Sequence, residues 1–106
     1  MAKVETVTSV GASGGRYSFD VYSWGQAFRA LGGVYLVLRR TANGNYDVLY
    51  VGQTGDLSER FDQHHKQGCF DRNQRTHIGI LLEGSEQRRL AIEQDLLGNY
   101  KTVCNF

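Results

Sequence analysis

Two β-rich runs on either side of a tight turn are the feature that most constrains the fold of this chain. Val34–Leu38 and Val48–Val51 consist of valine, leucine and tyrosine, a composition that favours strands bounded by turn residues. Between them, Asn43-Gly44 is the dipeptide typical of a tight hairpin turn. We therefore expect two adjacent antiparallel strands, with the hydroxyl groups of Tyr35 and Tyr50 opening into one cleft.

The segments that follow the hairpin predict two helices and a third strand. Asp56-Leu-Ser-Glu59 has the spacing of a capping box and predicts a helix over 57–66, followed by a polar loop. Alternating apolar residues predict a strand over 77–82. Ser85 is a capping residue for a second helix that continues to about residue 97.

The chain ahead of the hairpin is less regular. A stretch rich in glycine and serine is followed by alternating apolar residues over 16–23, which indicate a strand or edge element, and 24–31 is compatible with a short helix. We therefore expect one domain over 33–106, preceded by an N-terminal extension over 1–32. The predicted class is α+β: a small, mostly antiparallel three-stranded central sheet flanked by helices in the order β-β-α-β-α.

Composition and charge exclude some classes of protein. Hydrophobic residues make up 41% of the chain and charged residues 22%, as in ordinary soluble domains. No apolar run approaches the roughly 20 residues needed to span a bilayer, and the N-terminus lacks an apolar signal segment. These features predict a cytoplasmic protein without membrane contact, in which Cys69 and Cys104 are free thiols. The net charge of +1 neither indicates nor excludes a nucleic-acid partner.

Three polar residues fall on or beside the apolar faces of the predicted helices. Glu93 lies within the apolar arc of the second helix, where a carboxylate is costly unless it is paired or binds a cation. Glu93 is therefore either one partner of a buried salt bridge with Arg60 or Arg89, or a functional carboxylate. The sequence leaves both alternatives open. Arg60 and His64 share one face of the first predicted helix, where a packed arginine stem and a half-buried histidine are ordinary alternatives. The histidines and cysteines match no closed zinc pattern.

Two tripeptides and three later polar residues carry a resemblance to a known family. Gly33-Val34-Tyr35 and Tyr50-Val51-Gly52 lie at the two predicted strands, and Arg60, His64 and Glu93 follow. This arrangement, from Gly33 to Phe106, resembles the GIY-YIG nuclease superfamily, with valine at the middle of each tripeptide. The resemblance implies a shared active site whose members are Tyr35, Tyr50, Arg60, His64 and Glu93. It further implies that Glu93 is the metal ligand, and that Gly52 and Asn105 position the substrate.

By this resemblance, the chain is a metal-dependent endonuclease that hydrolyses phosphodiester bonds in DNA. Mg²⁺ or Mn²⁺ on Glu93 would act as the Lewis acid, and Arg60 would clamp the phosphate. Either a tyrosine orients or deprotonates the attacking water, or His64 takes that proton. Glu86 is the competing carboxylate, but in the first turn of its helix it is explained by the helix dipole.

Two positions depart from the family, and a second class of function stays open. Gln53 stands where repair nucleases of the family carry lysine, and no proline precedes Asn105. Specificity would come from a protein partner, because no separate DNA-binding domain is evident. The alternative is a non-catalytic nucleic-acid-binding or protein-interaction module on the same fold. The tyrosines would then be an aromatic cross-strand pair.

Overall fold

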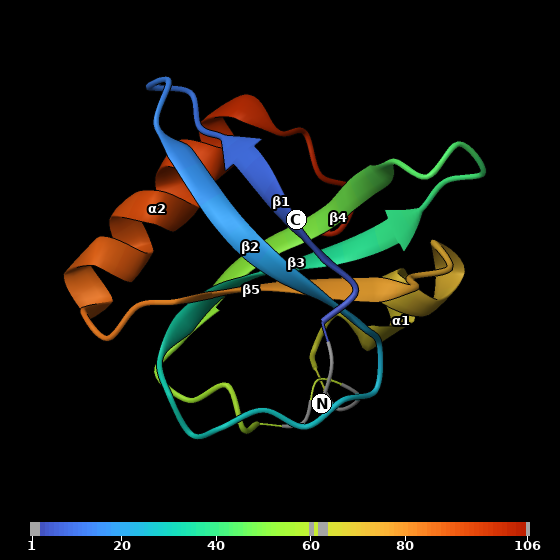
Figure 1. Cartoon of the computed structure of the whole chain (residues 1–106), viewed down its shortest axis with the longest axis horizontal. Coiled ribbons are helices and arrows are strands. Elements are labelled where there is room, and N and C mark those ends of the chain that lie inside the picture. Colours follow the sequence, from blue (N-terminus) through green and yellow to red (C-terminus); the bar gives the residue numbers. More distant parts are fainter. Residues whose placement is uncertain (1–2, 60, 62–63, 106) are drawn as a thin grey trace.

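The computed structural model describes residues 3–59, 61 and 64–105. Five strands form one antiparallel sheet in the described residues, and two helices accompany it (Figure 1). The strands are β1 (Glu5–Val10), β2 (Arg16–Ser23), β3 (Gly33–Arg40), β4 (Tyr46–Thr54) and β5 (His77–Leu82). The helices are α1 (Gln67–Arg72) and α2 (Glu86–Asn99), and the strand order across the sheet is β1-β2-β5-β3-β4.

The expectation of a three-stranded sheet in the order β-β-α-β-α is wrong, because the N-terminal residues contribute two strands to the same sheet. β1 pairs with β2, and β2 pairs with β5, placing Asp20 opposite Ile80. The alternation in β2 buries Phe19 and Val21 completely, and this apolar face can be buried only against the rest of the sheet. The glycine-rich stretch is the β1–β2 turn, in which Gly14 has a positive φ of 88°.

The hairpin prediction is confirmed, whereas the first predicted helix is wrong. β3 and β4 pair along their whole length, and Gly44 in the turn between them has a φ of 87°. No α-helix is present in the described part of 57–66, and α1 follows in the predicted loop. Asp56, the expected capping residue, forms a local turn instead. The side chain of Asp56 accepts the backbone N–H of Ser58 at 2.8 Å, and a turn of this kind competes with a helix.

The second predicted helix is confirmed, and the short helix expected over 24–31 is absent. α2 begins after Ser85, whose Oγ accepts the backbone N–H of Arg88 at 3.3 Å. Residues 24–31 form a turn and an irregular loop, in which Gly25 has a φ of 97°. No described helix is long and apolar enough to cross a membrane.

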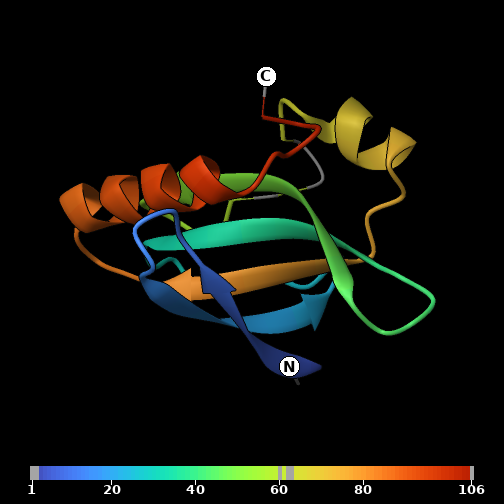
Figure 2. The same ribbon diagram turned by 90° about the horizontal axis from the view of Figure 1, so that it is seen from above.

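Each face of the sheet carries its own apolar core. One core lies between the sheet and α2 and includes Leu36, Ile92 and Leu96. The other core, on the opposite face, includes Tyr35, Val37 and the α1 residues Cys69 and Phe70. Figure 2 shows α2 and α1 lying along different parts of the sheet.

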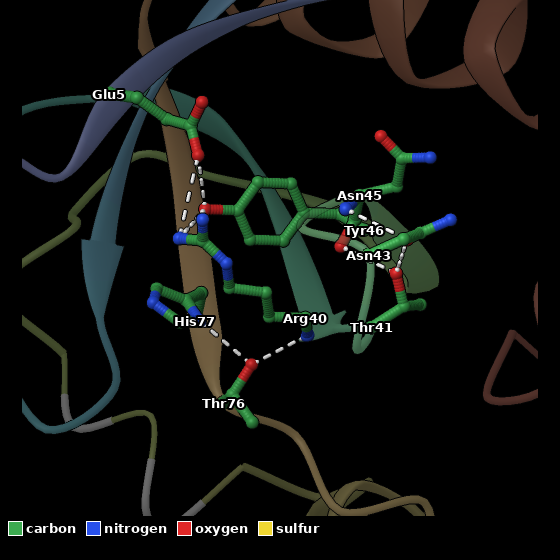
Figure 3. Close-up of polar contacts among 8 residues, drawn as sticks. All are labelled: Glu5, Arg40, Thr41, Asn43, Asn45, Tyr46, Thr76 and His77. Carbon is green, nitrogen blue, oxygen red and sulfur yellow. Dashed lines mark hydrogen bonds and ion pairs between the residues drawn. The ribbon is translucent and has the colours of Figure 1, made fainter.

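The sheet is curled, so that side chains of its two edge strands are in contact. Tyr46 on β4 donates its hydroxyl to Glu5 on β1 at 2.6 Å, although these strands are at opposite ends of the strand order. The guanidinium of Arg40 lies 3.7 Å from the same carboxylate and 5.6 Å from the centre of the Tyr46 ring (Figure 3). Below them, Thr76 accepts the backbone N–H of Arg40 at 2.7 Å. The sheet is therefore a half-barrel.

The two cysteines are not free thiols, as the sequence suggested, but form a disulfide. Cys69 on α1 is bonded to Cys104 near the C-terminus, 35 residues later. The bond fastens α1 and the C-terminal segment to the same end of the sheet, beside Leu49, whose carbonyl accepts the backbone N–H of Cys104 at 3.0 Å.

Candidate active site

The register of the central hairpin brings two tyrosines together on one face of the sheet. Tyr35 lies opposite Gly52, and Val37 lies opposite Tyr50, so all four residues share that face. The two rings are stacked, with centroids 6.0 Å apart and an interplanar angle of 27°. Both tyrosines line one hollow of about 340 Å³, together with six other residues: Gln53, Thr54, Glu59, Phe61, His64 and His65. We call this hollow the tyrosine cleft.

Close packing explains the glycine in each tripeptide. A Cβ at Gly52 would lie 2.5 Å from Cζ of Tyr35 and 2.7 Å from Cε2 of Tyr50. A Cβ at Gly33 would lie 2.7 Å from the carbonyl oxygen of Leu81. Any side chain at Gly52 would therefore push the tyrosine rings from their present positions, which gives this glycine a positioning role.

His64 holds the first tyrosine in place through a directed hydrogen bond. Its Nε2 lies 2.8 Å from the hydroxyl oxygen of Tyr35, and its Nδ1 accepts the backbone N–H of Lys66 at 3.0 Å. Burial, followed by the positive charges of His65 and Lys66, lowers the pKa of His64 to about 4. The ring is thus neutral near neutral pH with its proton on Nε2, so Nε2–H donates to Tyr35.

This tautomer assigns different roles to the two phenols. Since the Tyr35 oxygen accepts from His64, its own hydrogen is free to donate to Tyr50, and this hydrogen bond lowers the pKa of Tyr50. Burial acts in the opposite direction and is the largest influence, raising the pKa of both tyrosines, and the charge of Glu93 raises both further. Tyr35 is only 5% exposed and Tyr50 is half-buried. Tyr50 is therefore the more accessible phenol.

Glu93 is a half-buried carboxylate on α2 that is near enough to influence both tyrosines. Burial raises its pKa. Across residues 3–59, 61 and 64–105, no side chain or backbone group forms a hydrogen bond or ion pair with it. Such an environment suits a carboxylate that binds a cation. Glu86, the competing carboxylate, is exposed in the first turn of α2.

Arg89 is not the partner of Glu93, and sequence reasoning missed what it does. The side chain is buried, and its Nε donates to Oε1 of Gln53 at 3.0 Å. Its Nη1 donates to the carbonyl oxygens of Glu83 and Gly84 at 3.1 Å each. Arg89 therefore joins α2 to the end of β4 and to the β5–α2 loop. The position of Arg89 in the helical pattern gives no sign of these contacts, so this role could not be predicted from the sequence.

Asn105 is engaged with the backbone beside Tyr50. Its Oδ1 accepts the N–H of Val51 at 2.8 Å, and its Nδ2 donates to the carbonyl of Val51 at 2.9 Å. Thr102 donates its hydroxyl to the same Oδ1 at 2.5 Å. The asparagine thus fixes the C-terminal segment along the outer edge of β4, next to Tyr50 in the sequence of that strand.

The structure thus brings Tyr35, Tyr50 and His64 into one cleft with Gly52 beneath them, and places Glu93 within electrostatic range. Arg60, the predicted phosphate clamp, lies outside the described residues. No group of three or more histidine, cysteine, aspartate or glutamate side chains in the described residues is arranged to hold a metal. Comparisons of the chain with protein-family models, with curated proteins and with solved structures found no match.

Proposed function

We propose that this protein is a metal-dependent endonuclease that hydrolyses phosphodiester bonds in DNA. The observation that carries the proposal is the His64–Tyr35 hydrogen bond and the stacked Tyr35 and Tyr50 rings, together with the nearby carboxylate of Glu93, which has no partner among the described residues. A histidine–tyrosine pair of this kind directs a phenol oxygen, and an unpaired inward carboxylate supplies a ligand for a divalent cation.

Tyr50 is the residue that we propose to orient or deprotonate the attacking water. It is more exposed than Tyr35 and receives a hydrogen bond that lowers its pKa. Its pKa is nonetheless raised overall, first by burial and then by Glu93. A phenol in this state needs nearby positive charge to lose its proton near neutral pH. His64 and Tyr35 would keep the Tyr50 oxygen aimed into the cleft.

The half-buried carboxylate of Glu93 would suit a single divalent cation. Mg²⁺ is commonly held by one or two carboxylates together with substrate phosphates, so it does not require a cluster of three acidic side chains. Glu93 would be that carboxylate, and the bound ion would supply Lewis-acid stabilisation of negative charge on the phosphate. Arg60 is proposed, on its sequence position alone, to neutralise the same phosphate.

Location and partners are proposals of the same kind. A partner protein would supply DNA specificity, because the net charge of +1 offers little general attraction to phosphate. The cytoplasmic location expected from the sequence stays a prediction, and the Cys69–Cys104 disulfide weighs against it, because such bonds persist mainly in oxidising compartments.

Substitution of Glu93 by glutamine tests the proposed function. Glu93→Gln preserves size and removes the charge, so plasmid cleavage in Mg²⁺ or Mn²⁺ should fall by orders of magnitude while DNA binding in EDTA persists. The thermal midpoint should hold or rise, because the glutamine no longer has a half-buried charge to desolvate. Glu86→Gln, an exposed carboxylate on the same helix, is the matched control and should cleave normally.

Two outcomes would contradict the proposal. Full cleavage by Glu93→Gln would remove Glu93 from the site. A wild-type protein that binds DNA but leaves plasmid intact with either metal would favour the non-catalytic binding module.

A further inference from the structure

We propose that a second hollow, next to the tyrosine cleft, binds one unstacked nucleobase of the DNA substrate. The inference rests on the proposed function, because it identifies the form of DNA that the same site would accept. The hollow has a volume of about 460 Å³ and lies between the loop that follows β2 and the segment that follows β4. We call it the aromatic pocket.

The walls of the aromatic pocket are suited to a flat ring. Trp24, Phe28 and Phe61 line it, and the rings of Trp24 and Phe28 meet the Phe61 ring edge-on, at 6.3 and 6.2 Å between centroids. The guanidinium of Arg75 lies 4.8 Å from the centre of the Trp24 ring. Aromatic side chains and arginine planes are the surfaces on which proteins stack unpaired bases.

The polar groups of the pocket favour a neutral base over a cation. Aromatic cages also bind quaternary ammonium groups, but here the guanidinium of Arg75, which is paired with Asp71, already lies over the Trp24 ring where such a cation would sit. Glu59, Ser58 and Gln26 line the same hollow and offer hydrogen-bonding groups to the edge of a ring. Within the described residues, Nε of Arg75 is buried without a hydrogen-bond partner, so the protein does not use all of its donors.

Phe61 and Glu59 connect the aromatic pocket to the tyrosine cleft, because both residues line both hollows. The centroid of the Phe61 ring lies 4.9 Å from that of Tyr35 and 6.3 Å from that of Trp24, so this ring contacts the aromatic residues of both hollows. A nucleotide whose phosphate lies at the tyrosines therefore has a stacking site for its base, or for the adjacent base, immediately beyond Phe61.

Occupation of the pocket requires a base that has left the double helix. Unstacking costs a few kcal/mol in intact duplex and least in DNA that is already single-stranded. The substrate class is therefore DNA with single-stranded segments, flaps or open ends, in preference to uninterrupted duplex.

Trp24 makes the inference directly measurable, because it is the only tryptophan in the chain. The experiment adds a short single-stranded oligonucleotide, or the blunt duplex of the same sequence, to wild-type protein in EDTA. Tryptophan emission and electrophoretic mobility are followed together. We expect the single strand to quench the emission at lower concentrations than the duplex.

The failure of this inference can be distinguished from the failure of the proposed function. If DNA changes the electrophoretic mobility of the protein but not the Trp24 emission, base binding in the aromatic pocket is contradicted and the endonuclease proposal is unaffected. If neither form of DNA binds, both proposals are overturned. Equal quenching by duplex and single strand overturns the stated preference for unstacked bases.

A ring-removing variant provides the second measurement. Phe28→Leu retains an apolar side chain but removes a stacking face, so single-strand affinity should fall by about tenfold. Leu90→Ala, an exposed apolar residue on α2, is the control and should bind like wild type. Thermal midpoints of both variants establish that they are folded. A folded Phe28→Leu protein with unchanged affinity and unchanged quenching would also overturn the inference.

Discussion

The direction of one hydrogen bond organises the chemistry of the tyrosine cleft. Because Lys66 donates to Nδ1 of His64, the ring proton is placed on Nε2, and Tyr35 becomes an acceptor from His64. The hydroxyl hydrogen of Tyr35 is then available to Tyr50. A main-chain N–H outside the cleft thereby determines which phenol is free to act on a substrate.

The depressed pKa of His64 predicts a pH-dependent stability. Between pH 6.5 and about 4, the unfolded chain protonates this ring and the folded protein does not. The free energy of unfolding should therefore decrease as pH is lowered through this range. His64→Gln removes this contribution, so a plot of its thermal midpoint against pH should be flatter than that of wild type.

The other titrating groups are common to both proteins and therefore cancel in that comparison. Glu93, whose pKa is raised, opposes the trend, because its folded form takes up a proton first as pH falls. Asp95, whose pKa is lowered mainly by the hydroxyl of Tyr17, reinforces it at lower pH. Parallel plots for wild type and His64→Gln would show that His64 titrates normally in the folded protein.

The roles of some single residues could be predicted from the sequence, and those of others could not. Gly33 and Gly52 were predictable as parts of two tripeptides, and the structure supplies the reason in their contacts with neighbouring atoms. The inward position of Glu93 followed from helical periodicity. The role of Arg89 was not predictable, because its partners are backbone carbonyls whose positions depend on the folded chain.

Among the elements, local signals identified the hairpin and α2 but failed for α1. The turn at Asn43-Gly44 and the cap at Ser85 act within a few residues, so both can be recognised in the sequence. The six-residue helix α1 has no side-chain cap, and it is held by packing and by the bond from Cys69 to Cys104. A helix of this length has too little intrinsic stability to leave a pattern.

The disulfide should contribute substantially to stability. In the chain-entropy model, closing a loop of 35 residues raises the free energy of unfolding by roughly 3–4 kcal/mol. The double variant Cys69→Ser, Cys104→Ser should lose about this amount in denaturant titrations. Wild-type protein kept reduced is the matched control and should behave like the variant. A variant as stable as the oxidised protein would mean that the bond constrains little.

At the scale of the whole molecule, the curl of the sheet could not be predicted from sequence. The Glu5–Tyr46 hydrogen bond joins residues 41 positions apart on two strands that do not pair. Their approach depends on the accumulated twist of the intervening strands. The place of the N-terminal hairpin in the sheet could not be predicted for the same reason, because its partner β5 lies far along the chain.

Tyr46→Phe measures the strength of this closure. The substitution preserves the ring and removes the hydroxyl that donates to Glu5. The free energy of unfolding should decrease by about 1 kcal/mol, as for a typical partly exposed hydrogen bond. The control is Tyr22→Phe, since the Tyr22 hydroxyl has no hydrogen bond within the described residues. Equal stability of Tyr46→Phe and wild type would mean that the Tyr46–Glu5 hydrogen bond does not hold the two edges together.

The C-terminal segment has a consequence for the behaviour of the protein in solution. β4 is the last strand in the sheet order, and an outer strand normally offers unpaired backbone groups to other chains. Here the side chain of Asn105 forms hydrogen bonds with both backbone groups of Val51, and the backbone N–H of Cys104 donates to the carbonyl of Leu49. A second molecule therefore cannot add a strand to β4 at Val51, because the backbone groups that would pair with it are already bonded to the C-terminal segment.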